Sequence, residues 1–341
     1  MKKTLLLFSG ILLLYTSVFA DTVPLGYKNA VTAANNLNAL VYWDPLAGNG
    51  IMQKNGHQIS FRVGERIVLL DYTKLLLTDP PLLMDNILYF SDSFIKAAEE
   101  LFSTQSNDVN FRVGAILIDP GHGGKDPGAV ASHTIGGKKI TIQEKDIALT
   151  TALELHSLLS ASYPDKKILL TRSTDIYLSL EERVDIANSV KLQDNEAIIY
   201  VSIHANAAFD KKAGGYEVWY LSPGYRRSVL SDSGVDKDLL PILNSMMEEE
   251  YTTESILIAK FILEGLNTQI GKQMVNRGIK EEEWFVVRNA HMPSVLVELG
   301  FITNLQDAGL LNDKTYLRKT ALGIYNGLGA FITHFEQSGG F

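Results

Sequence analysis

Residues 116–124 read Ile-Leu-Ile-Asp-Pro-Gly-His-Gly-Gly, which indicates a buried strand ending in a glycine-rich loop. Short apolar runs of this kind are typical of strands in a sheet that is covered on both faces. The glycines on either side of His122 allow unusual backbone dihedrals and the close approach of a ligand. Open α/β sheets bind ligands at the carboxyl ends of their strands, so His122 is a candidate site residue. A tight turn with a solvated histidine is the alternative.

From Phe111 onward, apolar strand-like runs alternate with segments of helical periodicity. Strands are predicted at 115–119, 168–172, 197–204, 215–221 and 294–299, and helices at about 143–162 and 314–335. A Ser-Leu-Glu-Glu pattern at 179–182 has the form of a capping box and predicts one more helix start. The alternation predicts an α/β fold, a three-layer α/β/α domain on a mostly parallel sheet, over residues 112–335.

The preceding segment, residues 21–105, is predicted to be a small β-rich (α+β) domain. Asn55-Gly56 is a hairpin signal, and alternating apolar residues follow it. The alternating strands, the Val-Tyr-Trp-Asp run at 41–44 and the Pro-Pro-Leu at 80–82 resemble the amine-oxidase-type amino-terminal domain of bacterial exported proteins. That resemblance implies a non-catalytic positioning or wall-binding module. A linker is expected at 106–111 and a frayed tail at 336–341.

Composition excludes several classes of protein. The 341 residues are 46% hydrophobic and 21% charged, which is ordinary for a globular chain of about two domains. A net charge of −8 and the lack of a Lys/Arg cluster argue against a nucleic-acid partner. The chain has no cysteine, which excludes disulfides, thiolate metal sites and a cysteine nucleophile.

The first twenty residues have the pattern of a signal peptide. Two lysines follow Met1, a leucine-rich run extends to Ala20, and Val18-Phe19-Ala20 forms a small-residue cleavage pattern before Asp21. We therefore expect export to the periplasm or cell wall, with no stable membrane span after cleavage. An uncleaved anchor is the alternative.

Two later stretches supply the partners that a catalytic histidine needs. Glu144 begins a predicted helix, where an acid is also favoured by the helix dipole alone. His204 ends the apolar run 198–206, so a second strand delivers a histidine at its carboxyl end. Two imidazoles and one carboxylate form a ligand set of catalytic Zn²⁺, which keeps a fourth position open for water.

An acidic residue ends another predicted apolar strand. Glu298 follows Ser-Val-Leu-Val at 294–297, and burial of its carboxyl would raise its pKa toward the working pH, as a general base requires. A structural salt bridge from Glu298 to Arg288 or Arg172 is the alternative.

Together these motifs resemble the zinc-dependent N-acetylmuramoyl-L-alanine amidases of the third amidase class. The resemblance rests on Pro-Gly-His-Gly-Gly at 120–124, Glu144, Ser-Ile-His-Ala-Asn at 202–206 and Val-Glu-Leu-Gly-Phe at 297–301. Thr-Arg-x-x-Asp at 171–175 and the run 180–188 also match the family. Residues 146–149, Asp-Ile-Ala-Leu, depart from it, because an Asn-Leu pair is usual there.

The resemblance implies a site and a reaction. His122, Glu144 and His204 would hold one zinc ion, and Glu298 would be the catalytic acid/base. The substrate would be peptidoglycan, cleaved at the amide between N-acetylmuramic acid and L-alanine. We also expect Asn206 and Arg288 to position the substrate.

Residues 223–252 are an expected insertion, with a helix over about 238–250. Similar amidases of cell division carry a regulatory helix at this place, whose glutamate blocks the zinc until an activator protein removes it. The resemblance thus implies that Glu248, Glu249 or Glu250 is an inhibitory zinc ligand. A solvated, charged turn is the alternative.

Two other functions remain open for the same residues. A catalytically silent wall-binding or regulatory protein should have lost His122, Glu144, His204 or Glu298, and all four are present. A zinc peptidase acting on stem peptides is the alternative within enzymes. The intact set of four favours catalysis.

Overall fold

The computed structural model describes residues 23–45, 48–71, 74–103, 111–193, 195–225 and 240–338. The expected signal peptide, the expected linker apart from Phe111, and residues 226–239 of the expected insertion lie outside these ranges. Across the described residues, no helix combines the length and the apolar character needed to cross a membrane.

A six-stranded sheet with the order β12-β9-β13-β16-β14-β15 forms the centre of the carboxyl-terminal part. Its strands are β9 (Arg112–Pro120), β12 (Lys167–Leu170), β13 (Glu196–Asn206), β14 (Tyr216–Tyr220), β15 (Asn276–Glu281) and β16 (Ser294–Phe301). The first four strands in this order are parallel, and β14 runs antiparallel to β16. The predicted, mostly parallel sheet is confirmed.

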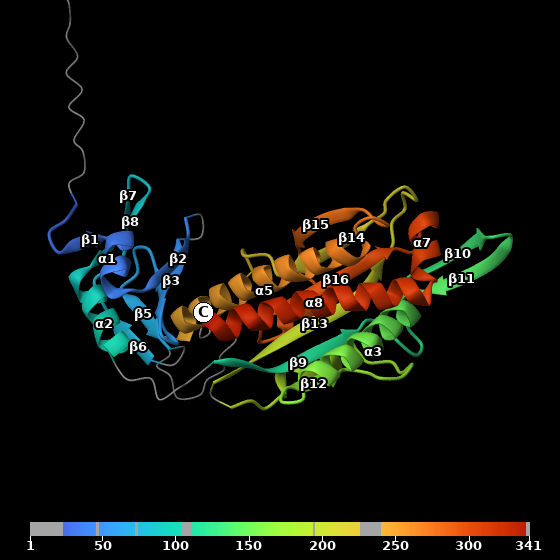
Figure 1. Cartoon of the computed structure of the whole chain (residues 1–341), viewed down its shortest axis with the longest axis horizontal. Coiled ribbons are helices and arrows are strands. Elements are labelled where there is room, and N and C mark those ends of the chain that lie inside the picture. The colour runs from blue at the N-terminus through green and yellow to red at the C-terminus, as the bar shows by residue number, and fades with distance from the viewer. Residues whose placement is uncertain are drawn as a thin grey trace, which may run out of the picture.

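Helices cover both faces of this sheet, and Figure 1 shows α3, α5 and α8 on one of them. One face is covered by α3 (Glu144–Ser162), α5 (Leu240–Ile270) and α8 (Lys314–Ser338), and the other by α4 (Leu180–Asn188) and α6 (Phe285–Asn289). Side chains of β9 alternate between the two cores: Ile116 and Ile118 face α3, α5 and α8, whereas Ala115 and Leu117 face α4 and α6. The α/β/α layering expected from the sequence is confirmed.

The remaining elements of this part lie near the carboxyl ends of the parallel strands. The hairpin of β10 (Val130–Ile135) and β11 (Lys138–Gln143) precedes α3, and α7 (Leu305–Leu311) follows β16. The capping box at the start of α4 is present, since Ser179 Oγ accepts from the Glu182 backbone and Glu182 caps Ser179 in return.

Three details differ from the expectations. The segment at 240–250 is no separate helix but the first part of the continuous α5, because neither glycine nor proline interrupts residues 242–264. Strand β15 was not predicted, because this edge strand has a single apolar residue, Ile279. The last helix continues to Ser338, beyond its expected end.

The amino-terminal part has two antiparallel sheets, β1-β8-β7 and β2-β3-β4-β5-β6. Its elements are β1 (Tyr27–Asn29), α1 (Ala30–Leu37), β2 (Leu40–Asp44), β3 (Asn49–Lys54), β4 (His57–Arg62), β5 (Ile67–Leu70), β6 (Lys74–Leu77), β7 (Leu82–Met84), β8 (Ile87–Ser91) and α2 (Asp92–Ser103). Asn55 and Gly56 both have positive φ, 52° and 79°, as a two-residue hairpin turn requires, so the predicted β3–β4 hairpin is confirmed.

The first half of α5 packs against the five-stranded sheet of the amino-terminal part (Figure 1). Arg62 Nη1 lies 3.0 Å from Glu249 Oε1, and Gln58 Nε2 donates to Glu250 Oε1 at 3.3 Å. Met246 packs against Leu69. The two parts of the chain therefore share a polar and apolar contact along this helix.

Candidate active site and metal centre

Neighbouring strand ends bring the predicted site residues together. Because β9, β13 and β16 are adjacent and parallel, their carboxyl ends meet at one edge of the sheet. His204 is in register with Glu298, so these two side chains project from the same face. His122 follows β9 by two residues and adopts a left-handed φ of 58°.

A hairpin brings the third ligand to this edge. Strands β10 and β11 pair so that Val130 lies opposite Gln143, which returns the chain to its starting point. The backbone N–H of Glu144 then donates to Ala129 O at 3.0 Å, and Ala129 N donates to Glu144 Oε2 at 2.9 Å. Glu144 is therefore held by local pairing as well as by the start of α3.

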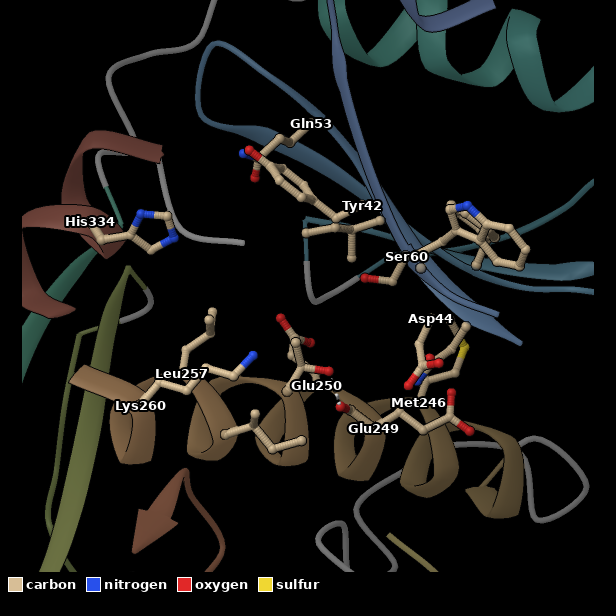
Figure 2. Close-up of a pocket in the computed structure, with 17 residues that line it drawn as sticks. Tyr42, Asp44, Gln53, Ser60, Met246, Glu249, Glu250, Leu257, Lys260 and His334 are labelled. Atoms are coloured by element: carbon tan, nitrogen blue, oxygen red, sulfur yellow. Dashed lines mark hydrogen bonds between the residues drawn. The ribbon is translucent and has the colours of Figure 1, made fainter. Parts of the chain in front are cut away.

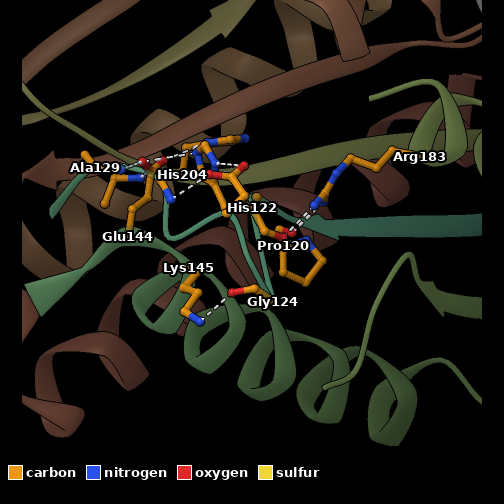
Figure 3. A network of polar contacts seen from close by, with 12 residues as sticks. Pro120, His122, Gly124, Ala129, Glu144, Lys145, Arg183 and His204 are labelled. Atoms are coloured by element: carbon orange, nitrogen blue, oxygen red, sulfur yellow. Dashed lines mark hydrogen bonds and ion pairs between the residues drawn. The ribbon is translucent and has the colours of Figure 1, made fainter. Parts of the chain in front are cut away.

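His122, Glu144 and His204 form a compact cluster (Figure 3). One ligand atom from each lies within 4.8 Å of the others. His122 Nε2 is 3.1 Å from Glu144 Oε2, and His204 Nδ1 is 2.8 Å from Glu144 Oε1. The three residues thus direct two ring nitrogens and one carboxylate toward a common point.

Hydrogen bonding keeps Glu144 ionised. Burial alone would raise the pKa of its carboxyl, but the hydrogen bonds with His122 and His204 outweigh burial and hold the pKa below its usual range. Neutral imidazole and carboxylate are donors that Zn²⁺ accepts, and three protein ligands leave a fourth position for water. The donor set therefore fits a catalytic zinc ion.

Asp126 orients the ring of His122, and the sequence analysis missed it. Its Oδ2 lies 2.7 Å from His122 Nδ1, while its Oδ1 accepts from Gly128 N at 3.0 Å. A carboxylate on the far ring nitrogen directs Nε2 toward a metal and raises its basicity. The available signal was an acid four residues after the histidine in the same glycine-rich loop.

We expect Asp126→Ala to weaken metal binding about 10- to 100-fold, because His122 loses the group that fixes its orientation. Competition with a chromogenic chelator measures this affinity. Asp185→Ala is the matched control, since Asp185 lies exposed on α4 and should leave the affinity unchanged. Equal affinities for the two variants would contradict an orienting role.

Two buried arginines hold the backbone of the His122 loop. Arg183 donates to Pro120 O at 2.7 Å and to His122 O at 2.5 Å (Figure 3). Arg172 donates to Pro120 O at 3.0 Å and to Gly121 O at 2.7 Å. Three successive carbonyls are thereby paired, which stabilises a loop that places a non-glycine residue at positive φ.

Asp119 anchors this arrangement at the end of β9. It is 0% exposed and accepts hydrogen bonds from Thr171, Arg183, Tyr200 and Ser202 at 2.6–2.8 Å. Burial would raise the pKa of Asp119, but Arg183 and the hydroxyl donors outweigh it and lower the pKa. Asp119 had no distinguishing signal in the sequence, because an acid before Pro-Gly is also common in turns.

Glu298 has the environment of a general base. It is buried, and its Oε2 has no hydrogen-bond partner among the described residues. Burial first, and then the charges of Glu144 and Glu217, raise the pKa of Glu298 well above the usual range. Within the described ranges it forms no ion pair, so the alternative of a salt bridge to Arg288 or Arg172 finds no support.

Beside Glu298 lies a charged cluster that the sequence analysis also missed. Glu217 is in register with Glu298 and binds Arg277 Nε at 2.6 Å and Lys280 Nζ at 2.5 Å. Asn206 Nδ2 donates to Glu217 Oε1 at 2.9 Å. Asn206 is therefore linked through Glu217 to the strand position next to Glu298, the predicted base. No sequence signal marked the cluster, because its cations come from the unpredicted strand β15.

Arg288 lies on α6, on the face of the sheet that carries Glu298. Its guanidinium stacks near the rings of Tyr225 and Phe285, at 5.5 and 5.6 Å, and its buried Nε has no hydrogen-bond partner in the described chain. Arg288 therefore lies on the same side of the sheet as Glu298, and the described residues show no contact between Arg288 and His122, Glu144 or His204.

The structure does not bring Glu248, Glu249 or Glu250 to the metal centre. Because α5 is continuous, these residues lie on its first half, where Glu249 pairs with Arg62 and Glu250 with Gln58. Glu248 is buried and accepts from Thr252. In this arrangement none of the three supplies a fourth ligand, which corrects the expectation drawn from the resemblance.

A parallel sheet edge with two histidines, a glutamate and a buried second acid defines a candidate metal hydrolase. Comparison with known proteins supports that class. The family model described as N-acetylmuramoyl-L-alanine amidase matches residues 116–330, which is more than half of the chain. The chain therefore belongs to the N-acetylmuramoyl-L-alanine amidase family.

Individual relatives agree with this assignment. The chain is 32% identical over 248 residues to the Probable N-acetylmuramoyl-L-alanine amidase AmiB of Haemophilus influenzae, covering 67% of this chain and 55% of the relative. It is 30% identical over 234 residues to the amidase AmiC of Escherichia coli, covering 64% and 52%. The chain thus spans about half the length of these curated relatives.

Among solved structures, the amidase AmiC2 of Nostoc punctiforme is similar to this chain. The two are 28% identical with a TM-score of 0.47, over 64% of this chain and 97% of the other.

Proposed function

We propose that this protein is a zinc-dependent N-acetylmuramoyl-L-alanine amidase that hydrolyses the amide between N-acetylmuramic acid and L-alanine in peptidoglycan. The observation that carries the proposal is the convergence of His122, Glu144 and His204 within 4.8 Å, with Glu298 in register beside His204. Membership of the amidase family supports the choice of substrate.

Metal binding and proton transfer in the amide hydrolysis are assigned to different residues. His122, Glu144 and His204 would hold the metal, and bound zinc supplies Lewis acidity toward the amide carbonyl and lowers the pKa of water. Glu298 takes a proton from the attacking water, and its raised pKa suits a group that must both accept and release a proton. Glu298 then donates that proton to the departing alanyl nitrogen.

Neighbouring groups would position the substrate. Asn206 is fixed by Glu217 beside Glu298, and Arg288 has an unpaired buried N–H on the same face of the sheet. We propose that both contact the muramoyl peptide. The amino-terminal part would be an amine-oxidase-type domain that binds or orients the wall, on a protein exported to the periplasm or cell wall.

Mass spectrometry of muropeptides after digestion with the purified protein tests the reaction and the metal together. We expect release of intact stem peptides from muramic acid, and loss of that release after treatment with a chelator and recovery with Zn²⁺. Cleavage inside the stem peptide would instead indicate a zinc peptidase. Binding to the wall without cleavage would indicate a catalytically silent protein.

A further inference from the structure

A cavity of about 410 Å³ lies between the amino-terminal sheet and α5 (Figure 2), and its lining does not include His122, Glu144 or His204. Its volume is within the range of small-ligand sites, about 300–1,000 Å³. One wall is a face of strands β2, β3 and β4, and the opposite wall is a stripe of α5 residues at helical spacing. The cavity therefore exists only where the two parts of the chain meet.

The sheet face that lines the cavity carries both apolar and polar side chains. The cross-strand pairs place Tyr42, Ile51 and Ser60 side by side on neighbouring strands. Gln53 follows Ile51 by two residues on β3 and therefore projects from the same face. The opposite face of these strands carries the apolar core of the amino-terminal part, including Met52 and Ile59. Hydrogen-bonding groups are thus turned toward α5.

Gln53 lines the cavity and, among the described residues, has an unpaired side-chain oxygen. The residue is 5% exposed, and the unpaired atom is Oε1. A buried amide oxygen without a partner is costly, about 1–3 kcal/mol, unless a ligand donates to it. The group that satisfies Gln53 must therefore carry an N–H or O–H.

Charges are separated along the cavity. Figure 2 shows Lys260 and His334 at one end, Asp44 at the other, and Glu249 and Glu250 on α5 between them. The interdomain contacts hold Glu249 and Glu250 in place. Lys260 follows Glu249 by eleven positions on α5, about 16 Å along the helix, and a tetrapeptide extends over about 13 Å.

We propose that this cavity binds a short peptide with a free amino terminus and a free carboxylate, as released by the proposed amidase reaction on which this inference rests. The ammonium group lies against Glu249 and Glu250, and the carboxylate lies at Lys260. Gln53 accepts a hydrogen bond from a peptide N–H, and the ring of Tyr42 covers the backbone. The site holds the product and takes no part in the cleavage.

Calorimetric titration of the full chain with synthetic L-Ala-γ-D-Glu-L-Lys-D-Ala tests this proposal without turnover. We expect saturable binding that weakens at least about tenfold when the peptide is N-acetylated, since a paired charge is lost. Glu250→Gln, which keeps the acceptor for Gln58, and Lys260→Met, at an exposed position, should weaken it similarly. Glu264→Gln, exposed on α5 outside the cavity, is the control and should bind like the wild type.

Other results would overturn the proposal. Absence of binding, equal binding of the acetylated peptide, or binding of a muramyl disaccharide in place of the peptide would each contradict it. Loss of binding in Glu298→Gln would put the peptide in the active site instead. Amidase activity is measured separately on the same wild-type preparation, so failure of the peptide site and failure of the proposed reaction give different results.

Discussion

Glu298→Gln is expected to lower the rate of stem-peptide release by about 10²–10⁴-fold, the contribution typical of a positioned general acid–base. The amide that replaces the carboxyl has nearly its shape but does not exchange protons at neutral pH. Because Glu298 is no metal ligand in this arrangement, the variant should retain its zinc. Release of muropeptides, followed by mass spectrometry, gives the rate, and elemental analysis gives the metal content.

The same substitution should leave the fold intact, which separates catalysis from stability. In the metal-free protein, burial raises the pKa of Glu298, so the folded state retains a proton that the unfolded chain releases above about pH 4.3. Wild-type stability therefore falls as pH rises from there through the raised pKa, and Glu298→Gln removes this loss. A variant that unfolds more readily at neutral pH, or keeps its activity, would contradict the role.

Arg183→Ala is expected to lower the free energy of unfolding by about 3–5 kcal/mol, because it leaves the buried Asp119 carboxylate without its cation. It also removes the donors to Pro120 O and His122 O, so metal affinity should fall with stability. Urea unfolding of the chelator-treated protein measures the first effect, and chelator competition measures the second.

An exposed ion pair provides the matched control for Arg183→Ala. Arg318 Nε lies 3.0 Å from Glu154 Oε1 on the surface, so Arg318→Ala should change the free energy of unfolding by less than about 1 kcal/mol. The pKa of Asp119 is lowered in the folded state, so its stabilisation is present above about pH 3.9 and is lost as pH falls through the folded pKa. The difference between wild type and Arg183→Ala should therefore shrink in acid. Equal losses for the two arginine variants would contradict the anchoring role.

Strand ends were predictable from local sequence, because an apolar run followed by a polar or glycine-rich loop is a short-range pattern. His122, His204 and Glu298 were found in this way. Glu144 had the weaker local signal, since an acid at a helix start has a simpler explanation, and it became a candidate only in combination with the two histidines.

The polar clusters around Asp119 and Glu217 depend on residues far apart in the chain and could not be predicted from the sequence. Asp119 shares hydrogen bonds with residues 52 to 83 positions away, and Glu217 binds cations on β15, about 60 positions away. Neither cluster has a local pattern. The same reason explains the correction at Glu248–Glu250: the helical periodicity predicted a helix there, but only packing determined that it faces the amino-terminal sheet.

By itself, the sequence determined the α/β class, the strands that end in functional side chains and the family. Tertiary structure alone decided that two rings and a carboxylate lie within 4.8 Å, that Glu298 is in register with His204, and that a cavity forms between the amino-terminal sheet and α5. The tendency of a segment to form a strand or a helix depends on residues that are close together in the chain. Distances between their ends depend on sheet order, register and the packing of both helical layers, which no local pattern encodes.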